Sequence, residues 1–173
     1  MTGTLRTYII AEAGVNHNGS LDMALKLVDA AADAGADAVK FQTFKAEALV
    51  AADAPKAAYQ IRNTGESDSQ FAMLKKLELS PDDHLALLTY CQKKGIGFLS
   101  SPFDLESLSF LCDVLRLGVI KLGSGEITNA PLLLEAGRKA KHVILSSGMS
   151  TLAEVEDALG VLAFAMTAPQ DAA

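Results

Sequence analysis

The 173-residue sequence has no tryptophan, few other aromatic residues, two cysteines and three histidines. Cys91 and Cys112 are far apart and form no Cys-x-x-Cys motif, and no two histidines have the spacing of metal ligands. These absences argue against a zinc site and against a disulfide framework. Reduced thiols in a cytoplasmic protein are therefore expected.

Basic residues and long apolar runs are also scarce. The 15 Lys and Arg are outnumbered by 21 Asp and Glu, so the formal net charge is −6. A broad basic surface is not expected, which argues against nucleic acid or an anionic membrane as a partner. No apolar run reaches the length of a membrane span, and the first residues do not resemble a signal peptide. An anionic ligand would have to be bound locally, by a few lysines and backbone amides.

Short apolar runs alternate with segments of helical periodicity along the chain, which predicts five strands each followed by a helix. Helix starts are indicated by Ser20, by Ser80 before Pro81, by Asn129 and by a capping box at Thr151. Residues 45–69 are predicted to be a long excursion outside the core, and four methionines are predicted to fill the core. The strands are expected at 8–11, 38–44, 96–103, 119–122 and 143–148, and the methionines are Met23, Met73, Met149 and Met166.

Polar residues that could take part in binding or catalysis follow each predicted strand. A (β/α)8 barrel concentrates such residues at the carboxyl ends of all its strands, whereas a doubly wound sheet binds its ligand at one switch point. A complete barrel takes roughly 250 residues, so the fold class is predicted to be α/β, an incomplete (β/α)8 TIM barrel with about five βα units. These polar residues are Glu12, Lys40, Gln42, Ser100, Ser101, the segment 121–126, Ser146 and Ser147.

The segment 119–128 carries Lys121 on an apolar strand and then Gly123, Ser124, Gly125 and Glu126. A glycine-rich loop can bring backbone N–H groups close to a phosphate or carboxylate. Two alternatives stay open: Lys121 is a surface lysine beside a turn, or Lys40 and Lys121 are Schiff-base lysines of an aldolase. Two lysines with a glycine-serine loop fit an anionic substrate better.

Five segments together resemble the sialic acid synthase family, which comprises N-acetylneuraminate synthases and the related legionaminic and pseudaminic acid synthases. The resemblance runs from about Tyr8 to about Leu159. Each motif alone is weak, but the five in order are specific. The segments are 10–19, 39–44, 98–104, 121–128 and 144–149.

The resemblance implies a condensation of phosphoenolpyruvate with an N-acylated amino sugar such as N-acetylmannosamine, which releases phosphate. It also implies a divalent metal, Mn or Mg, and a full-length homodimer in which a small antifreeze-like domain follows the barrel. The chain is predicted to hold part of the barrel at 1–166 and a tail without pattern at 167–173, and to lack the antifreeze-like domain. By motif, Lys40, Ser101, Lys121, Ser124 and Ser146 would bind phosphoenolpyruvate, and Glu12, Gln42 and Glu126 would face the sugar or the attacking water.

The family's metal ligands are two histidines on later strands, so no metal ligand is expected in this chain. His17 either touches substrate or has a structural hydrogen bond, and His84 is expected on a surface helix. Ser146 and Ser147 could instead cap the next helix, and the roles of Glu12 and Glu126 are not separated by sequence. The alternative function is an inactive barrel fragment that retains only a half-site for phosphoenolpyruvate.

Overall fold

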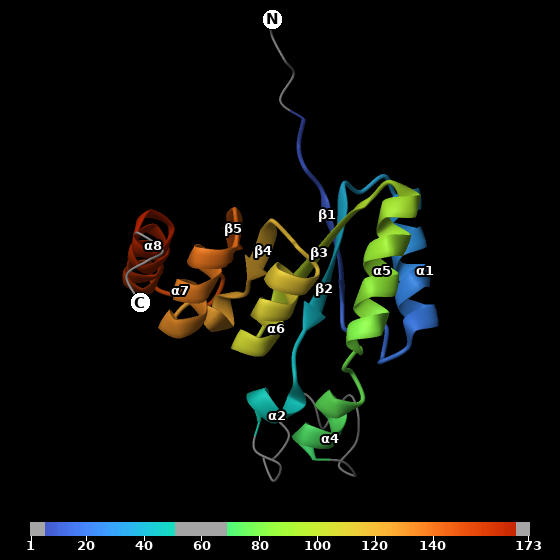
Figure 1. The fold of residues 1–173 in the computed structure, drawn as a ribbon, viewed down its shortest axis with the longest axis horizontal. Coiled ribbons are helices and arrows are strands. Elements are labelled where there is room, and N and C mark those ends of the chain that lie inside the picture. Colours follow the sequence, from blue (N-terminus) through green and yellow to red (C-terminus); the bar gives the residue numbers. More distant parts are fainter. Residues whose placement is uncertain (1–5, 51–68, 169–173) are drawn as a thin grey trace, which may run out of the picture. The chain divides into compact units, whose positions relative to one another are not determined.

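The structure is a computed structural model that describes residues 6–50 and 69–168. Within these residues five strands alternate with helical segments, as the sequence predicts (Figure 1). The elements are β1 (Ile10–Gly14), α1 (Leu21–Asp33), β2 (Ala38–Thr43), α2 (Ala46–Leu49), α4 (Gln70–Lys75), α5 (Pro81–Lys94), β3 (Gly97–Pro102), α6 (Leu105–Ser109), the π-helix η1 (Phe110–Val114), β4 (Val119–Leu122), the 3-10 helix η2 (Ser124–Glu126), α7 (Ala130–Lys139), β5 (His142–Leu145) and α8 (Leu152–Thr167).

The chain divides into two compact units. The first comprises residues 1–41 and 79–99, and the second comprises 42–78 and 100–173. The strands form a three-stranded sheet in the order β1-β2-β3 and a two-stranded parallel sheet of β4 and β5. The predicted domain boundary at 166 stays a prediction; α8 ends at Thr167, and residues 169–173 lie outside the described part.

Helix starts follow the local sequence signals closely. Ser20 accepts a hydrogen bond from the Met23 N–H, Thr151 forms the predicted capping box, and the predicted helix start at Ser80 is also a capping box. These side chains satisfy backbone N–H groups that the first helical turn leaves without a partner. Gly95 ends α5 with φ of +70°, a left-handed conformation that glycine adopts at little cost.

Three expectations were wrong because they depend on distant parts of the chain. Strand β1 begins at Ile10, two residues later than predicted, and Tyr8 and Ile9 are exposed. The strand continues to Gly14, so Glu12 lies within it and not at its end. The predicted excursion contains the helix α2, whose Ala46 is buried; residues 51–68 of that excursion lie outside the described part.

The core of the first unit lies between the strands and the helices α1 and α5, which run side by side in Figure 1. Phe41 on β2 stacks on Phe98 on β3 with ring centroids 5.7 Å apart. Val28 on α1 and Leu87 on α5 are fully buried. These apolar contacts stabilise the unit because they remove hydrocarbon surface from water.

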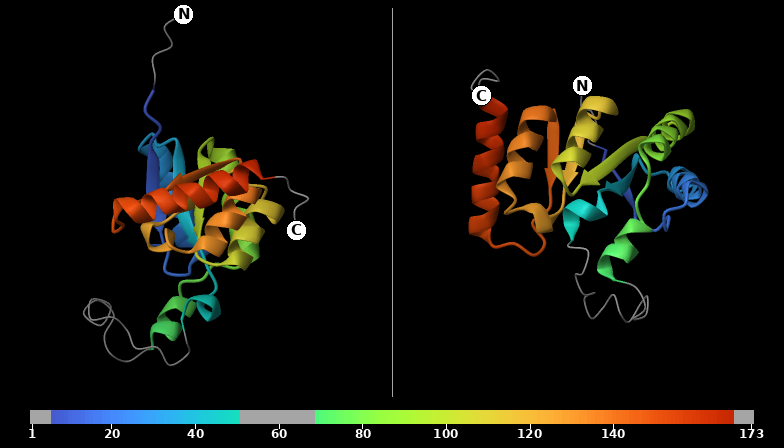
Figure 2. Two further views of the ribbon diagram at one scale, coloured as in Figure 1. Left: turned by 90° about the vertical axis from the view of Figure 1, so that its left-hand side faces the viewer. Right: turned by 60° about the horizontal axis from the view of Figure 1, so that its bottom comes forward.

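In the second unit, α7 and α8 pack closely against each other (Figure 2). A Cβ added at Gly137 of α7 would lie 2.5 Å from the Ala165 Cβ of α8, a distance that real carbon atoms do not reach. The two helix backbones approach this closely only because residue 137 has no side chain. Ile120 and Leu122 of β4 and Leu132 and Leu133 of α7 are buried in this core.

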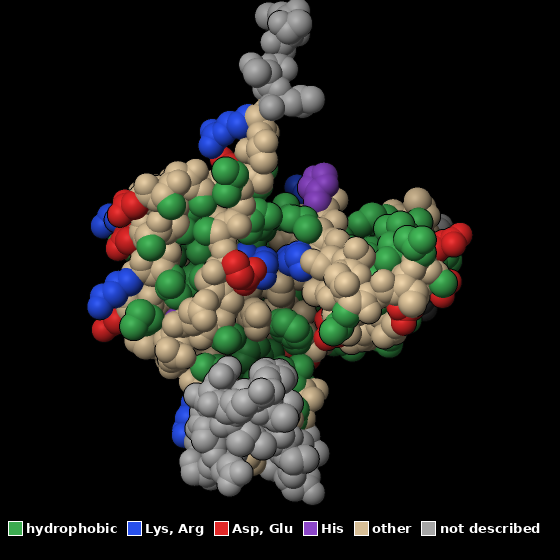
Figure 3. All heavy atoms as spheres, turned by 180° about the vertical axis from the view of Figure 1, so that it is seen from behind, with side chains coloured by type: hydrophobic (Ala, Val, Ile, Leu, Met, Phe, Trp, Pro, Cys, Tyr) green, Lys and Arg blue, Asp and Glu red, His purple; other side chains and the backbone are tan. Residues whose placement is uncertain are grey.

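Helix α8 also carries apolar side chains that face solvent. Leu152 is 89% exposed and Phe164 is 62% exposed, and Figure 3 shows hydrophobic side chains gathered on the surface of the part of the second unit that contains α8. The prediction that the methionines fill the core was wrong for three of them, since Met23, Met149 and Met166 are exposed.

Candidate functional site

Glu12 and Lys40 form an ion pair within the first unit. The parallel register of β1 and β2 places Glu12 beside Lys40, and their Nζ and Oε2 atoms are 2.7 Å apart. The Lys40 side chain is only 11% exposed, whereas that of Glu12 is 56% exposed. A lysine this buried needs a compensating charge. The Glu12 carboxylate supplies that charge at hydrogen-bond distance from the Lys40 Nζ.

Gln42 and Ser101 lie at the carboxyl ends of β2 and β3. Their chain neighbours Thr43 and Ser100 join the two strand ends through a hydrogen bond of 2.7 Å between their hydroxyl groups. Ser100 and Ser101 are buried, and Gln42 is partly exposed. Thr43 was not predicted, because a cross-strand hydroxyl pair depends on a register that sequence alone does not give.

Lys121, Ser124 and Ser146 come from β4 and from the loops that follow β4 and β5. The Lys121 Nζ donates to the Leu122 carbonyl at 2.9 Å. The Ser146 N–H donates to the same carbonyl at 3.1 Å, which extends the pairing of β4 and β5 into the loop. A Cβ added at Gly148 would lie 3.6 Å from the Ser124 Oγ, so these two loops touch.

The two glycines of this loop do not have positive φ. Gly123 has φ of −73°, and Gly125 is not among the described glycines with positive φ. Residues 124–126 form one turn of 3-10 helix. A Cβ added at Gly123 or Gly125 meets no atom within 4 Å. The backbone conformation at these two positions therefore does not require glycine. The absence of side chains leaves the backbone of the loop accessible.

Glu126 is the last residue of this turn, and its carboxylate is held by the side chain of Asn129. The Asn129 Nδ2 donates to the Glu126 Oε2 at 2.8 Å. The other end of the same amide, Oδ1, accepts from the Leu132 N–H at 3.3 Å and so caps α7. The cap is as predicted, but the contact to Glu126 was missed.

The structure therefore brings the predicted residues together in smaller groups. Glu12 and Lys40 belong to the first unit, and the other six belong to the second. Convergence of all eight at one rim stays a prediction. Within the second unit, Gln42 and Ser101 are the chain neighbours of the hydroxyl pair that joins β2 and β3, Lys121 and Ser146 donate to the same Leu122 carbonyl, and Ser124 and Glu126 share one 3-10 turn.

His17 and His84 are both buried in the first unit, so the expectation of a surface position for His84 was wrong. The Gly19 N–H donates to the His17 Nδ1 at 3.0 Å, so the neutral ring carries its hydrogen on Nε2. Burial lowers the pKa of His17, with a further lowering by His84 and an opposing effect of Asp83. The burial of His17 favours its structural alternative. Nε2 has no hydrogen-bond partner among the described residues.

The two cysteines are buried and not bonded to each other. Burial raises the pKa of Cys91 to about 12 and also raises the pKa of Cys112. Both thiols are therefore protonated at neutral pH and are poor nucleophiles. Within residues 6–50 and 69–168, no group of three His, Cys, Asp or Glu side chains has an arrangement that would hold a metal ion. No described helix is long and apolar enough to cross a membrane.

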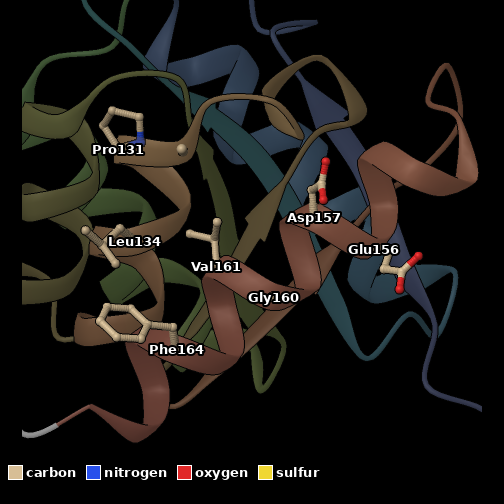
Figure 4. Close-up of a pocket in the computed structure, with 8 residues that line it drawn as sticks. Pro131, Leu134, Glu156, Asp157, Gly160, Val161 and Phe164 are labelled. Carbon is tan, nitrogen blue, oxygen red and sulfur yellow. The ribbon is translucent and has the colours of Figure 1, made fainter.

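An open groove of about 830 Å³ runs between α7 and α8 (Figure 4). Its walls are mostly apolar and include Leu134 of α7 and Val161 and Phe164 of α8. Glu156 and Asp157, which come earlier in α8, also line it. None of the eight predicted site residues lines it. The groove is therefore a separate feature from the strand-end residues described above.

Comparison with known proteins identifies relatives over most of the chain. The model of the NeuB family matches residues 27–171. The N,N'-diacetyllegionaminic acid synthase of Campylobacter jejuni is 51% identical over 157 residues, which is 91% of this chain and 47% of that protein. The enzyme of the same name from Legionella pneumophila is 50% identical over 90% of this chain and 44% of that protein.

A solved structure shares the fold. The N-acetylneuraminic acid synthetase of Leptospira borgpetersenii, crystallised with citrate, matches with a TM-score of 0.76 and 33% identity over 92% of this chain and 50% of that one. The match confirms the predicted fold class, an α/β fold of barrel type with alternating βα units over half the length of the relative. The chain thus spans about half the length of the relatives it matches.

Proposed function

The chain belongs to the NeuB family, and from that premise we propose that it takes part in condensing phosphoenolpyruvate with an N-acylated amino sugar. The products are a nonulosonic acid and phosphate. Two relatives that are about half identical to this chain are named N,N'-diacetyllegionaminic acid synthases. Their names favour an amino sugar with two N-acetyl groups over N-acetylmannosamine.

The observation that carries the proposal is the buried ammonium of Lys40 paired with Glu12. Phosphoenolpyruvate has two anionic ends, a carboxylate and a phosphate. Lysine ammonium groups and hydroxyl donors bind such oxygens with charge-assisted hydrogen bonds. In the proposal Lys40 and Lys121 supply the charge, and Ser101, Ser124 and Ser146 supply further donors.

The same residues suit the chemistry of the condensation. The enol carbon of phosphoenolpyruvate attacks the aldehyde carbon of the open-chain sugar, whose C=O bond opens and whose oxygen takes up a proton. Water then adds to the cationic carbon that results. The proton of that water goes to a carboxylate, and the C–O bond to phosphate then breaks. Glu126 or Glu12 would accept the proton, and Gln42 would face the sugar. Positioned base catalysis of this kind contributes about 10²–10⁴-fold in rate.

A divalent metal is implied by the family resemblance, but the described residues do not provide a site for it. Among them no cluster of three ligating side chains exists, whereas catalytic metals are typically held by at least that many protein ligands. The predicted homodimer of the full-length protein and the cytoplasmic location stay predictions.

Calorimetric titration with phosphoenolpyruvate tests the proposal. Lys121→Ala should weaken binding by about tenfold or more, because a hydrogen bond to a charged group contributes about 1.5–3 kcal/mol. Lys141→Ala is the matched control, since Lys141 is an exposed lysine just before β5. It should leave the affinity unchanged.

Turnover is measured separately, as phosphate released from phosphoenolpyruvate only when an N-acylated amino sugar is present. Binding without turnover would support the alternative of a half-site that does no chemistry. No binding by the unaltered protein, or equal affinity of the Lys121 and Lys141 variants, would overturn the proposed site.

A further inference from the structure

Asn129 uses the two ends of its side-chain amide for different tasks. Its Oδ1 accepts from the Leu132 N–H and caps α7, and its Nδ2 donates to the Glu126 carboxylate. The backbone closes the same turn, since the Asn129 N–H donates to the Glu126 carbonyl at 3.0 Å. Glu126 is thus joined to the start of α7 twice, through its backbone and through its side chain.

The chemistry of the two contacts fixes which way the amide points. The carbonyl oxygen must face the Leu132 N–H and the NH2 group must face the carboxylate, because the reverse would place two acceptors and two donors together. Capping alone would not select asparagine. Serine and aspartate cap helices about as well, but an ionised aspartate has no hydrogen to donate and serine is too short to span both partners.

We infer that Asn129 is a positioning residue that orients the Glu126 carboxylate for its part in the condensation, an inference that rests on the proposed function. The amide holds Oε2. Oε1 has no hydrogen-bond partner among the described residues, and so it can accept a proton. A carboxylate that must meet a water or a sugar hydroxyl gains from being fixed in one rotamer, because the cost of ordering it is met during folding.

Two substitutions separate positioning from capping. Asn129→Asp and Asn129→Ser both keep an oxygen that caps α7, and both lose the donor to Glu126. The first adds a negative charge beside Glu126 and the second does not, so agreement between them excludes a purely electrostatic effect. Thr151→Ala is the control, because it removes the cap of α8 in the same unit without touching Glu126.

The first readout is the mobility of the Glu126 side chain, measured by 13C relaxation in the wild type and in each variant. We expect an ordered side chain in the wild type and in Thr151→Ala. In both Asn129 variants we expect a mobile side chain, with the melting temperature close to that of the wild type. A mobile Glu126 in the wild type, or an ordered one in Asn129→Ser, would overturn the inference.

The second readout is a double-mutant cycle on turnover with Glu126→Gln. Each Asn129 variant should lower kcat by about tenfold, a part of what base catalysis contributes, and should leave the KM for phosphoenolpyruvate unchanged. In the Glu126→Gln background the same Asn129 changes should have no further effect. Equal losses in both backgrounds would show that Asn129 acts through helix stability and would overturn the inference.

The two proposals fail in different ways. If Glu126 is ordered by Asn129 but the wild type neither binds nor turns over phosphoenolpyruvate, the proposed function fails and the contact has another purpose. If the wild type binds and turns over substrate but the Asn129 variants match it in kcat, the inference fails and the proposed function stands.

Discussion

The two lysines of the candidate site differ in their burial and in one acceptor that each of them contacts. Lys40 in the first unit is almost buried and meets a carboxylate from the neighbouring strand at 2.7 Å. Lys121 in the second unit is partly exposed, and it donates to a neutral carbonyl of its own strand. An anion that approaches Lys40 must compete with the Glu12 carboxylate. At Lys121 an anion would replace a hydrogen bond to the neutral Leu122 carbonyl, which costs less. The contrast predicts that Lys40 contributes more to stability and Lys121 more to binding.

The largest expected effect on stability is that of Glu12→Gln. The change removes the Glu12 carboxylate from beside the buried Lys40 side chain, and removal of one member of a fully buried pair costs about 3–5 kcal/mol. Because Glu12 is more than half exposed, we expect a smaller loss of about 1–2 kcal/mol in the free energy of urea unfolding.

Glu135→Gln in the second unit is the control for this contrast. Glu135 pairs with Arg138 one turn along α7, where both side chains are substantially exposed. Its loss should cost less than about 0.5 kcal/mol. Equal effects of the two substitutions would remove the distinction between a buried and an exposed pair.

Mildly acidic pH should lower the stability of the first unit more than that of the second. The pKa of His17 is lowered in the folded state, chiefly by burial, so the unfolded chain binds more protons at mildly acidic pH. The stability from His17 is complete above about pH 6.5 and is lost as the pH falls below it, with a slope of at most about 1.4 kcal/mol per pH unit.

His17→Asn should flatten this dependence between pH 7.5 and 5, because the amide oxygen of the substituted side chain can still accept the Gly19 N–H but cannot titrate. His142→Asn, at the exposed start of β5, should leave the pH dependence unchanged. Parallel curves for the wild type and His17→Asn, recorded as urea midpoints, would contradict the assignment.

The smallest effect is expected from two residues with positive φ, one in each unit. Arg116 has φ of +58° and Asn18 has φ of +50°. A left-handed conformation strains arginine more than asparagine, whose short side chain tolerates it. Arg116→Gly should therefore raise the unfolding free energy by about 0.5–1 kcal/mol, and Asn18→Gly should change it by only about a few tenths. A loss of stability in Arg116→Gly would contradict the strain argument.

Sequence predicted the parts of the molecule that depend on near neighbours. The caps at Ser20, Ser80, Asn129 and Thr151 are as expected, because each is decided by three or four consecutive residues. The alternation of strands and helices is also correct, since apolar periodicity reports which face of each element is buried.

Features that depend on how distant segments meet were missed. His84 has a polar neighbourhood in sequence, and yet the packing of α5 buries it. The hydroxyl pair of Thr43 and Ser100 spans 57 positions along the chain and follows from strand register. The hydrogen bond from the Asn129 side chain to Glu126 requires the turn before α7 to bring these two residues together. The sequence pattern of a helix cap does not reveal that turn.

The register shift between Glu12 and Gly14 in β1 limits which deletions this strand tolerates. Glu12 pairs with Lys40 and Gly14 with Phe41, so Ala13 is one residue more than the partner strand has. Deleting Ala13 would make the ladder regular only if Gly14, which now has φ of +53°, became an extended residue directly after Glu12, and the loop that follows would then have to change its conformation. A variant shortened by this one alanine should therefore fold less well than one in which Ala13 is exchanged for serine.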